Sequence, residues 1–440
     1  MKKILSFAVI LLLPFFVAAQ HSFRAVVRDS ASGEVLAGVT VVAGKTGETH
    51  LTNDSGRVQF GNLPGGENGF TLTYSGTTAK EVVFVLPDTA VHLIYMVREA
   101  ASLEQVVIST TRTEARMESS PLKVEVLGRE EMDEENTIKP GNIASILGDV
   151  SGVQIQQSSP VSGNANVRIQ GLEGRYTQIL RDGMPLFEGF SGGFGILTIP
   201  PLDLRQIELV KGSASTLYGG GAIGGLVNLI SKRPTAKQEA VLTLNQTTLK
   251  ESNINTYLAK RSNGFGYTFF GGFTRQGATD VNGDGLTDVS KQNTYIVHPR
   301  LFFYPSTKTT IIAGYTGTFS TNTGGDILVL KGLKNTQHQF FETNDTKRHT
   351  GEFILEQNFP KGLKGAIKSS ISQFDRRLET ASHFFRGRQR NYYTEATLFI
   401  PRNHWNLVAG ANVTGDAFEK KPSDPVRLQN VSSNTLGAFA

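Results

Sequence analysis

The sequence contains no cysteine in 440 residues. This absence excludes disulfides, thiolate metal sites, cysteine nucleophiles and an N-terminal lipid on cysteine. A strong excess of one charge is also missing, because the formal net charge is +5 and Lys2 and Lys3 supply two of those charges. A chain so close to neutral gives no reason to expect a nucleic-acid partner.

Long hydrophobic runs are absent after the first 19 residues. Residues 1–19 begin with two lysines, continue through ILSFAVILLLPFFV and end in small residues, which is the pattern of a secretory signal peptide. No later segment has the run of about 20 apolar residues that a membrane-spanning helix needs. Glycine, threonine and aromatic residues are plentiful, so a mature protein that crosses a membrane is expected to do so as a β-barrel.

Signatures of enzymes are missing as well. The eight histidines are scattered, and neither H-E-x-x-H nor G-x-S-x-G occurs. The acidic stretch REEMDEEN, residues 129–136, is expected to be a solvated helix face. We therefore predict that the chain is not an enzyme and has no catalytic residue.

Gly219, Gly221 and Gly224 fit the dinucleotide pattern G-x-G-x-x-G. That pattern binds a pyrophosphate only when a helix opens on its last glycine. Here the β-branched and apolar run 226–230 follows, and Pro234 leaves too few residues for a crossover helix. The sequence therefore favours a glycine turn between two strands.

Residues 20–98 contain short strand patterns separated by turn signals such as SASGE, NDSG and NLPGGENG. This spacing predicts a small antiparallel β-sandwich. The order of strands and turns resembles the carboxypeptidase-regulatory-like domain that precedes many outer-membrane receptors. Its three histidines, His21, His50 and His92, are dispersed, so we expect a spacer or docking domain, or a plain solvent-exposed scaffold, and no peptidase.

Residues 99–111 form a linker with one short extended segment. That segment consists of Glu104, Gln105, Val106, Val107, Ile108, Ser109 and Thr110. A segment of this kind can add as a strand to the open sheet edge of another protein. It resembles the TonB box of TonB-dependent outer-membrane receptors, and the alternative is an ordinary edge strand.

Residues 112–232 resemble the plug domain of the same receptors, with four blocks in the same order and at similar spacing. Arg168 and Gly171 match an arginine–glycine turn, and Asp182 and Gly183 match an aspartate–glycine hairpin whose type I′ preference has a physical basis. The remaining matches are Glu208, Gly212, Tyr218, Gly219, Gly221, Gly224, Gly225 and Asn228. The glycines are expected to permit sharp turns and close strand approach.

Four plug arginines are candidates for either ligand contact or internal ion pairs. They are Arg168, Arg175, Arg181 and Arg205. We expect each of them to pair with acids inside a barrel, although an anionic chelate also favours arginine.

Residues 233–440 alternate apolar or aromatic residues with mixed ones, as in FGYTFFGGF and NTYIVHPRLFFY. About ten such strands are expected, and together with the plug they predict part of a transmembrane antiparallel β-barrel, the alternative being a soluble all-β domain. A barrel that encloses a plug has about 22 strands and needs roughly 450 residues after the plug. The sequence therefore predicts a mainly β protein whose barrel is incomplete, about halfway truncated, and unable by itself to transport.

The stretch DVNGDGLTD places oxygen ligands at Asp280, Asn282, Asp284 and Asp288, with a carbonyl at Leu286. This matches much of a calcium loop, but Lys291 stands where an EF-hand has its bidentate glutamate. The stretch is therefore either a looser Ca²⁺ site in an extracellular loop or a solvated turn between two strands. No other cofactor is expected.

The resemblance implies a location in the outer membrane, contact with its lipid, and TonB-dependent uptake of a small chelate of the ferric siderophore or cobalamin type. It also implies that the periplasmic domain of TonB pairs with residues 104–110. A SusC-like glycan or peptide importer and a TonB-dependent signal transducer remain alternatives. A non-transporting β-rich surface adhesin is the alternative from a different class.

Overall fold

The computed structural model describes residues 21–30, 32–74, 77, 79–97, 107–108, 115–116, 124–159, 161–186, 189–214, 218–402, 405–421 and 429–440. The expected signal peptide lies outside this range. The chain divides into two compact units, Met1–Val106 and Val107–Ala440, which we describe separately.

The first unit is a β-sandwich with a core of stacked aromatic rings. One sheet has the strand order β4-β1-β7 and the other the order β3-β2-β5-β6. Phe23, Phe60 and Phe70 lie between the sheets with at most 1% of their surface exposed. The strands are β1(His21–Asp29), β2(Thr40–Ala43), β3(Thr49–Leu51), β4(Arg57–Leu63), β5(Gly66–Thr73), β6(Lys80–Leu86) and β7(Val91–Met96).

The sandwich differs in one respect from the antiparallel arrangement expected from the sequence. Strand β7 pairs with β1 in parallel, with Arg24 opposite Val91 and Asp29 opposite Met96. After β6 the chain leaves the second sheet, crosses to the first and enters beside β1 in the same direction. Alternation along a strand reports which residues are buried but not the direction of the neighbouring strand.

The second unit contains the plug, a small α+β domain. Its five-stranded sheet has the order β10-β15-β16-β13-β14, and β11 and β12 form a separate pair. Ile143, Leu147, Ile207 and Leu229 are fully buried in its main core. The elements are β10(Val124–Leu127), α2(Arg129–Ile138), α3(Ala144–Gly148), β11(Val153–Ser159), β12(Asn164–Ile169), η2(Gly174–Tyr176), β13(Thr177–Arg181), β14(Met184–Pro185), η3(Gly189–Ser191), η4(Ile196–Thr198), β15(Leu204–Lys211), η5(Gly220–Ala222) and β16(Gly225–Ser231).

Helix α2 carries the acidic stretch 129–136, and its surface is only partly solvated. The side chain of Glu131 accepts a hydrogen bond from the Gly128 amide at 2.8 Å, which caps the helix start. Met132 is 1% exposed and Glu135 6% exposed, so the expectation of a wholly solvated acidic face is wrong. Burial raises the pKa of Glu135, whose carboxylate accepts a hydrogen bond from the Ser145 hydroxyl. One acid of the stretch therefore joins α2 to α3.

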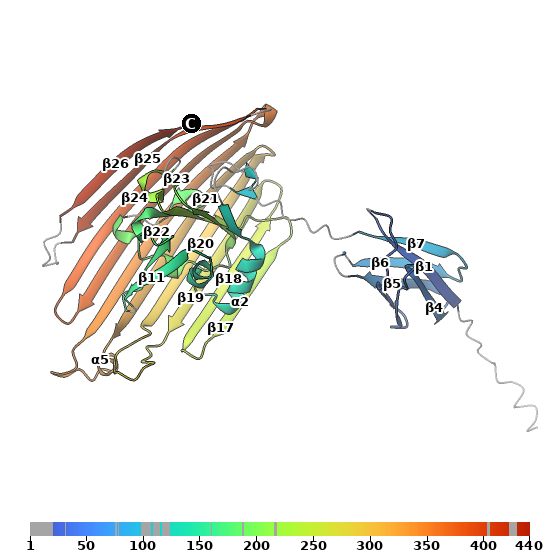
Figure 1. Cartoon of the computed structure of the whole chain (residues 1–440), viewed down its shortest axis with the longest axis horizontal. Helices are drawn as coiled ribbons and strands as arrows, with labels where there is room; N and C mark the ends of the chain where they lie inside the picture. The colour runs from blue at the N-terminus through green and yellow to red at the C-terminus, as the bar shows by residue number, and fades with distance from the viewer. Residues whose placement is uncertain are drawn as a thin grey trace, which may run out of the picture. The chain divides into compact units, whose positions relative to one another are not determined.

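Ten antiparallel strands form one continuous curved sheet behind the plug, as the sequence predicted (Figure 1). The plug elements lie against its concave face. The strands are β17(Glu239–Gln246), β18(Glu251–Arg261), β19(Phe265–Gln276), β20(Lys291–Ser306), β21(Thr309–Gly325), β22(Phe341–Asn358), β23(Lys364–Thr380), β24(Phe384–Pro401), β25(Asn406–Lys420) and β26(Val431–Phe439). In the described residues, β17 and β26 are the edges of this sheet.

The two faces of the sheet follow the period of two residues expected for strands. On β20, Tyr295, Leu301 and Phe303 are 41–54% exposed on the outside, whereas His298, Arg300 and Phe302 are at most 3% exposed toward the plug. Among the helices of the described residues, none is long and apolar enough to cross a membrane.

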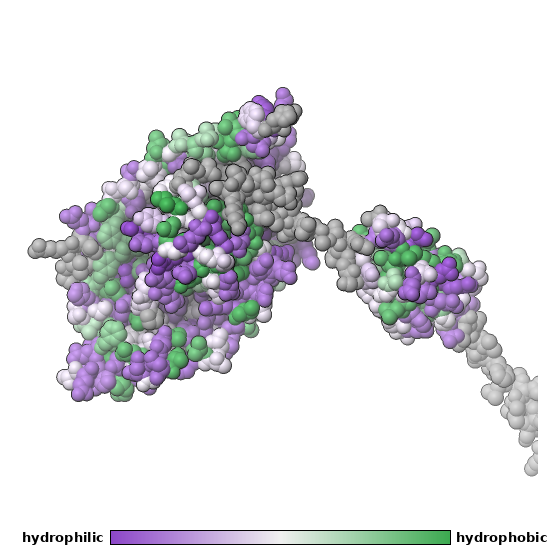
Figure 2. Space-filling view, in the orientation of Figure 1, coloured by the Kyte–Doolittle hydropathy of each residue, from purple (hydrophilic) through white to green (hydrophobic). Residues whose placement is uncertain are grey.

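The two ends of the sheet carry connections of different length. Segments 277–290 and 326–340, the latter with α5(Ile327–Leu330), join strands at one end, which we call the loop end. Residues 262–264 and 307–308 join strands at the other, which we call the turn end. The part of the surface around α5 is largely hydrophilic (Figure 2). Outer-membrane barrels have long extracellular loops and short periplasmic turns, so in the barrel expected from the sequence the loop end would face the outside of the cell.

Candidate functional site: the plug and its contacts with the sheet

The expected TonB box, 104–110, falls mostly outside the described residues. Within it, Val107–Ile108 form the short strand β8, which pairs with β9(Ala115–Arg116) in antiparallel register. The backbone of these two residues is therefore extended, as pairing with a partner strand requires. Its role as a TonB box stays a prediction.

The aspartate–glycine pair lies at the centre of the plug's contact with the sheet. Asp182 and Gly183 have φ angles of 51° and 84°, as both central residues of a type I′ turn require. The turn joins β13 to β14 and projects toward the barrel strands. Its Gly183 amide donates to the Asn228 side chain at 3.0 Å, and Asp182 accepts from the Ser231 amide at 3.0 Å. Both bonds tie the turn to β16.

Glu208 and Asn228 lie opposite each other on β15 and β16 and are fully buried. The Asn228 amide donates to Glu208 at 3.2 Å, and Gln206 donates to the same carboxylate at 2.9 Å. A buried carboxylate is stable only when hydrogen bonds satisfy it. These hydrogen bonds hold β15 and β16 of the plug sheet together.

The glycine pattern of residues 219–225 forms a turn and not a nucleotide loop. It contains only the three-residue helix η5, and strand β16 follows directly. Gly212, Gly219 and Gly225 have φ angles of 130°, 78° and 154°. A Cβ at Gly225 would lie 2.7 Å from Ile169 and would also collide with the Val210 carbonyl oxygen. The glycines therefore let β16 approach β15 and β12, as expected from the sequence.

The four arginines expected to pair with acids behave differently from one another. Arg181 pairs with Asp203 in the interior, and Arg175 pairs with Glu173 at the surface. Arg205 donates to Gln206 at 3.0 Å. Arg168 donates to the carbonyls of Gly171 and Leu172 and to Gln156, so it closes the turn around Gly171, and among the described residues it joins no ion pair. Its five donors suit several carbonyls at once.

A buried ion network joins the plug turn to the barrel strands. Arg300 on β20 lies 2.8 Å from Asp182 and 2.6 Å from Glu352 on β22. Lys368 on β23 donates to the Asp182 carbonyl at 2.8 Å. Two barrel strands, β20 and β23, thus contact one plug residue, and Glu352 on β22 pairs with the arginine that makes one of these contacts.

A second part of the network involves Asp203, just before β15. One oxygen of Asp203 lies 2.6 Å from Arg181 and 2.7 Å from His298 on β20. Burial alone raises the pKa of Asp203, but the Arg181 guanidinium and His298 outweigh it and lower that pKa to about 2. Burial also raises the pKa of Asp182, but the nearby Arg300 guanidinium outweighs this effect, so the pKa is lowered. Both aspartates are therefore charged at neutral pH, and they bind Arg300 and His298 of the sheet.

Sequence reasoning missed His298, Arg300, Glu352 and Lys368. The available signal was the placement of charged residues on the alternate positions of apolar strands, such as His298 and Arg300 in NTYIVHPRLFFY. A charge on the inner face of a barrel wall needs a partner. The sequence does not say which plug residue supplies it.

Aromatic rings and arginines gather where the plug approaches the loop end, and we call this group the apex cluster. It comprises Phe190, Phe194, Arg348, Phe374, Arg376, Phe385 and Phe418. Phe190 contacts three of the other rings at centroid distances of 4.9–5.9 Å.

Two guanidinium groups lie within this cluster. That of Arg376 lies 4.2 Å from the ring centre of Phe194, and that of Arg348 lies 4.5 Å from the ring centre of Phe374. Arg348 also donates to oxygens of Ser191 and Phe194. Two guanidinium groups therefore lie at the plug apex, and that of Arg348 is buried, since this residue is 5% exposed.

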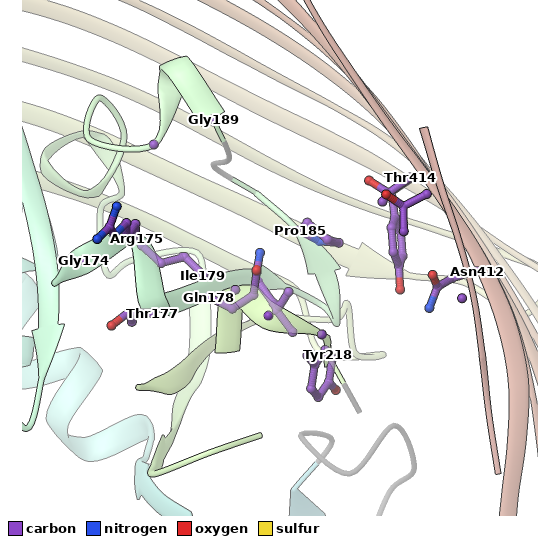
Figure 3. A pocket seen from close by; sticks show the side chains of 18 of the residues that line it. Gly174, Arg175, Thr177, Gln178, Ile179, Pro185, Gly189, Tyr218, Asn412 and Thr414 are labelled. Carbon is purple, nitrogen blue, oxygen red and sulfur yellow. The ribbon is translucent and has the colours of Figure 1, made fainter. Parts of the chain in front are cut away.

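A cavity of about 660 Å³ separates the plug from strands β24 to β26. Gln178 and Tyr218 line its plug side, and Asn412 and Thr414 line its sheet side (Figure 3). Gly221 and Tyr393 line the cavity as well. Its volume lies in the range of small-molecule sites.

The loop with the expected calcium ligands is closed by its own side chains. Asp280 accepts from the amides of Gly283 and Gly285 at 2.8 and 2.9 Å, and Asp288 accepts from Val281 at 2.7 Å. Asn282 accepts from the Asp284 amide, and Asp284 from the Leu286 amide. In the described residues, no group of three or more histidines or acids is arranged to hold a metal ion. Calcium binding by a rearranged loop remains a prediction.

Comparisons with known proteins agree with this architecture. Residues 116–226 match the model of the TonB-dependent Receptor Plug Domain. The vitamin B12 transporter BtuB of Vibrio cholerae is 29% identical over 140 residues, which are 32% of this chain and 22% of that protein. The ferrioxamine receptor of Yersinia enterocolitica is 26% identical over 203 residues, 46% of this chain and 27% of that protein.

Among solved structures, the siderophore receptor PirA of Acinetobacter baumannii superposes with a TM-score of 0.55 at 17% identity. The match covers 69% of this chain and 49% of that one. The chain therefore spans about half the length of the solved receptor, and its matches cover about a quarter of the curated relatives. Together the comparisons confirm the resemblance to TonB-dependent outer-membrane receptors and the combination of plug and barrel strands.

Proposed function

We propose that this TonB-dependent outer-membrane receptor takes part in the energy-driven uptake of a scarce, anionic metal chelate of the ferric siderophore type. The observation that carries this choice of ligand is the apex cluster. Arg348 and Arg376 place two positive charges among phenylalanine rings at the end of the plug that faces the extracellular loops. Guanidinium groups recognise carboxylate and other oxyanions, and aromatic rings provide a rigid apolar surface.

Cobalamin is the second candidate ligand. It is favoured by the relatives named vitamin B12 transporters, among them the one from Vibrio cholerae. The apex charges distinguish the two, because a cationic apex suits an anionic chelate better than a largely neutral corrinoid.

The plug contacts suggest how transport proceeds. The ligand binds above Phe190 and Phe194, and the segment 104–110 becomes available on the periplasmic side. TonB pairs with that segment as an added strand, and force from the inner membrane shifts the plug. Energy comes from the partner, so the chain itself needs no nucleotide site. The ion network around Asp182 and Asp203 sets the resistance that this force must overcome.

Uptake by a strain that lacks its own chelate and cobalamin receptors tests the proposal. The receptor is expressed from its complete gene, and accumulation of radiolabelled ferric siderophores and of labelled cobalamin is measured. We expect accumulation of a ferric chelate that stops on loss of TonB, and on replacement of Ile108 by proline, which removes a strand amide. The matched variant Ser109→Ala should transport normally.

Each alternative gives a different result. Uptake of cobalamin alone would replace the anionic chelate by the second candidate. Ligand binding without accumulation, accompanied by altered transcription, would indicate a signal transducer. Uptake that is unaffected by Ile108→Pro and by loss of TonB would overturn the proposal.

A further inference from the structure

The outer surface of strands β21 to β25 has a basic hollow near the loop end. Its volume is about 610 Å³, and six cationic residues line it. One of them, Arg376, directs its guanidinium to Phe194 on the plug side. The other five are Lys347, Arg377, Arg386, Arg388 and Lys421. Asp345 and Asp375 line it as well. The cations outnumber the acids, and the plug and the proposed ligand lie on the other side of the sheet.

The strand period fixes the direction of these side chains. Arg348, next to Lys347, contacts the plug residue Ser191, and Arg376, next to Arg377, contacts the plug ring of Phe194. Successive side chains of a strand point to opposite faces. Lys347 and Arg377 therefore point away from the plug, as do their cross-strand neighbours.

The register of the strands places like charges next to one another. Arg377 on β23 lies directly opposite Arg386 on β24. The Lys421 amide donates to the Arg386 carbonyl at 3.0 Å, which brings Lys421 to the same level. Directly opposite like charges destabilise a sheet. A bound anion would compensate these three cations, which we call the cationic row.

The two acids that line the hollow have partners outside the cationic row. Asp375 pairs with Arg388 at 2.7 Å, and Asp345 accepts from Thr321 at 2.7 Å. Glu379 pairs with Arg377 at 2.5 Å, and Glu419 lies 3.6 Å from Lys421, but 30–44% of these side chains is exposed, so both pairs contribute little. Among the described residues no ion pair involves Arg386.

The hollow borders the apolar part of the outer surface. Toward the turn end, the outward residues of the same strands are apolar or aromatic, including Ile371, Tyr392, Phe353 and Leu398, each 39–67% exposed. An apolar band flanked by aromatic residues is the lipid-facing part of an outer-membrane barrel and is about 25 Å tall. The strands β22 to β24 have 17–18 residues and rise on the order of 45 Å when tilted, so their loop ends extend beyond that band. The cationic row lies where lipid headgroups begin.

We propose that this hollow binds the phosphate groups of an anionic glycolipid in the outer leaflet of the membrane. Two guanidinium groups and an ammonium group in one row suit a phosphate, which accepts bidentate hydrogen bonds from arginine and attracts lysine. Aliphatic stems and nearby rings then contact the acyl chains below. The inference rests on the outer-membrane location of the strands and does not depend on which chelate is transported.

Binding of the lipid is tested with the chain purified in detergent. The probes are bis-phosphorylated lipid A, the same lipid after enzymatic removal of its phosphates, and inorganic phosphate. We expect the wild-type protein to bind the phosphorylated lipid about tenfold or more tightly than the dephosphorylated one, because each charge-assisted bond contributes on this scale. Equal affinity for both lipids would overturn the proposal. Equal binding of free phosphate would overturn the assignment to a lipid.

A variant without the three charges of the cationic row tests whether the lipid binds there. Replacing Arg377, Arg386 and Lys421 by glutamine is expected to weaken lipid A binding about tenfold or more. The matched control replaces Lys260, Lys308 and Arg402, exposed cations of the turn end, and should bind lipid A as the wild type does. Equal affinity in the two variants would contradict the site.

If the glutamine variant of Arg377, Arg386 and Lys421 fails to fold, the affinities of the wild-type protein for phosphorylated and dephosphorylated lipid A still test the proposal. Chelate uptake by the folded variant should persist, so a failure of this inference and a failure of the proposed transport give different results.

Discussion

Arg300 on β20 contacts Asp182 of the plug at 2.8 Å, although the two residues are 118 positions apart in the chain. Only 2% of the Arg300 side chain and 13% of the Asp182 side chain is exposed. Glu352 lies on the other side of the same guanidinium. One arginine of the sheet therefore holds a plug turn whose geometry is fixed by its own backbone.

Replacing Arg300 by methionine should release the plug from the sheet. The change leaves Asp182 and Glu352 buried without their cation, which costs about 3–5 kcal/mol. Thermal unfolding in detergent and protease sensitivity of the plug measure this effect. The double variant Asp182→Asn, Arg300→Met should recover part of the loss, because one uncompensated charge is removed.

The control for Arg300 is Arg233→Gln, which breaks an ion pair with Glu356 that is 32–47% exposed. That change should cost less than about 1 kcal/mol. An equal effect of the two variants would show that the buried pair has no special role.

Acid should weaken the plug contacts, and neutral pH should not. The pKa values of Asp182 and Asp203, the latter about 2, are lower in the folded protein than in the unfolded chain. Their contribution to stability is therefore complete above about pH 4, near the unfolded pKa of aspartate, and is lost as the pH falls toward 2. The thermal midpoint should be steady from pH 7 to 5 and should fall below 4. In the variant Asp203→Asn, the thermal midpoint should fall less steeply below pH 4. A wild-type midpoint that falls only between pH 7 and 5 would show that these aspartates are not responsible.

Glutamine at Arg348 or Arg376 should weaken ligand binding. Each loses a charge at the plug apex, and a hydrogen bond to a charged group contributes on the order of tenfold in affinity. Titration of the purified protein with the ferric chelate identified by uptake gives the Kd. Arg377→Gln is the matched control, because this neighbouring residue points away from the plug. Unchanged affinity in the Arg348 and Arg376 variants would place the ligand elsewhere.

Gly225→Ala should destabilise the plug. The φ angle of Gly225 is 154°, and an added Cβ would collide with Val210 and Ile169. Overpacking with backbone strain costs about 2 kcal/mol or more. Gly220→Ala, five residues earlier, meets nothing within 4 Å and has no positive φ, so its effect on plug unfolding should be small. A Gly225 variant as stable as the Gly220 variant would show that β16 can move aside.

Calcium at millimolar concentration should raise the thermal midpoint if loop 280–288 binds it. The carboxylates of Asp280 and Asp288 accept hydrogen bonds from backbone amides of the loop. Calcium binding therefore requires these carboxylates to turn toward the ion. The variant Asp280→Asn, Asp288→Asn should lose the response, and magnesium should replace calcium poorly. Equal thermal midpoints with and without calcium would show that loop 280–288 is a hydrogen-bonded turn and not a calcium site.

Several features of this protein could be predicted from neighbouring residues alone. The Asp182–Gly183 turn, the glycine turn before β16 and the strands β17 to β26 depend on local backbone preference and on alternation with a period of two. The plug was identifiable for the same reason, because its blocks combine such turns at fixed spacing. The burial of Glu135 was not predicted, since a run of acids gives no sign that one of them faces α3.

The sequence by itself determined the strands, the turns and the faces they present, because these follow from short-range sterics and from hydrophobic periodicity. Only the tertiary structure decided that Arg300 contacts Asp182, that His298 contacts Asp203, and that Arg377 lies opposite Arg386. These contacts depend on strand register and on the position of the plug against the sheet. Both are set by packing over the whole unit, which brings together residues far apart in the chain.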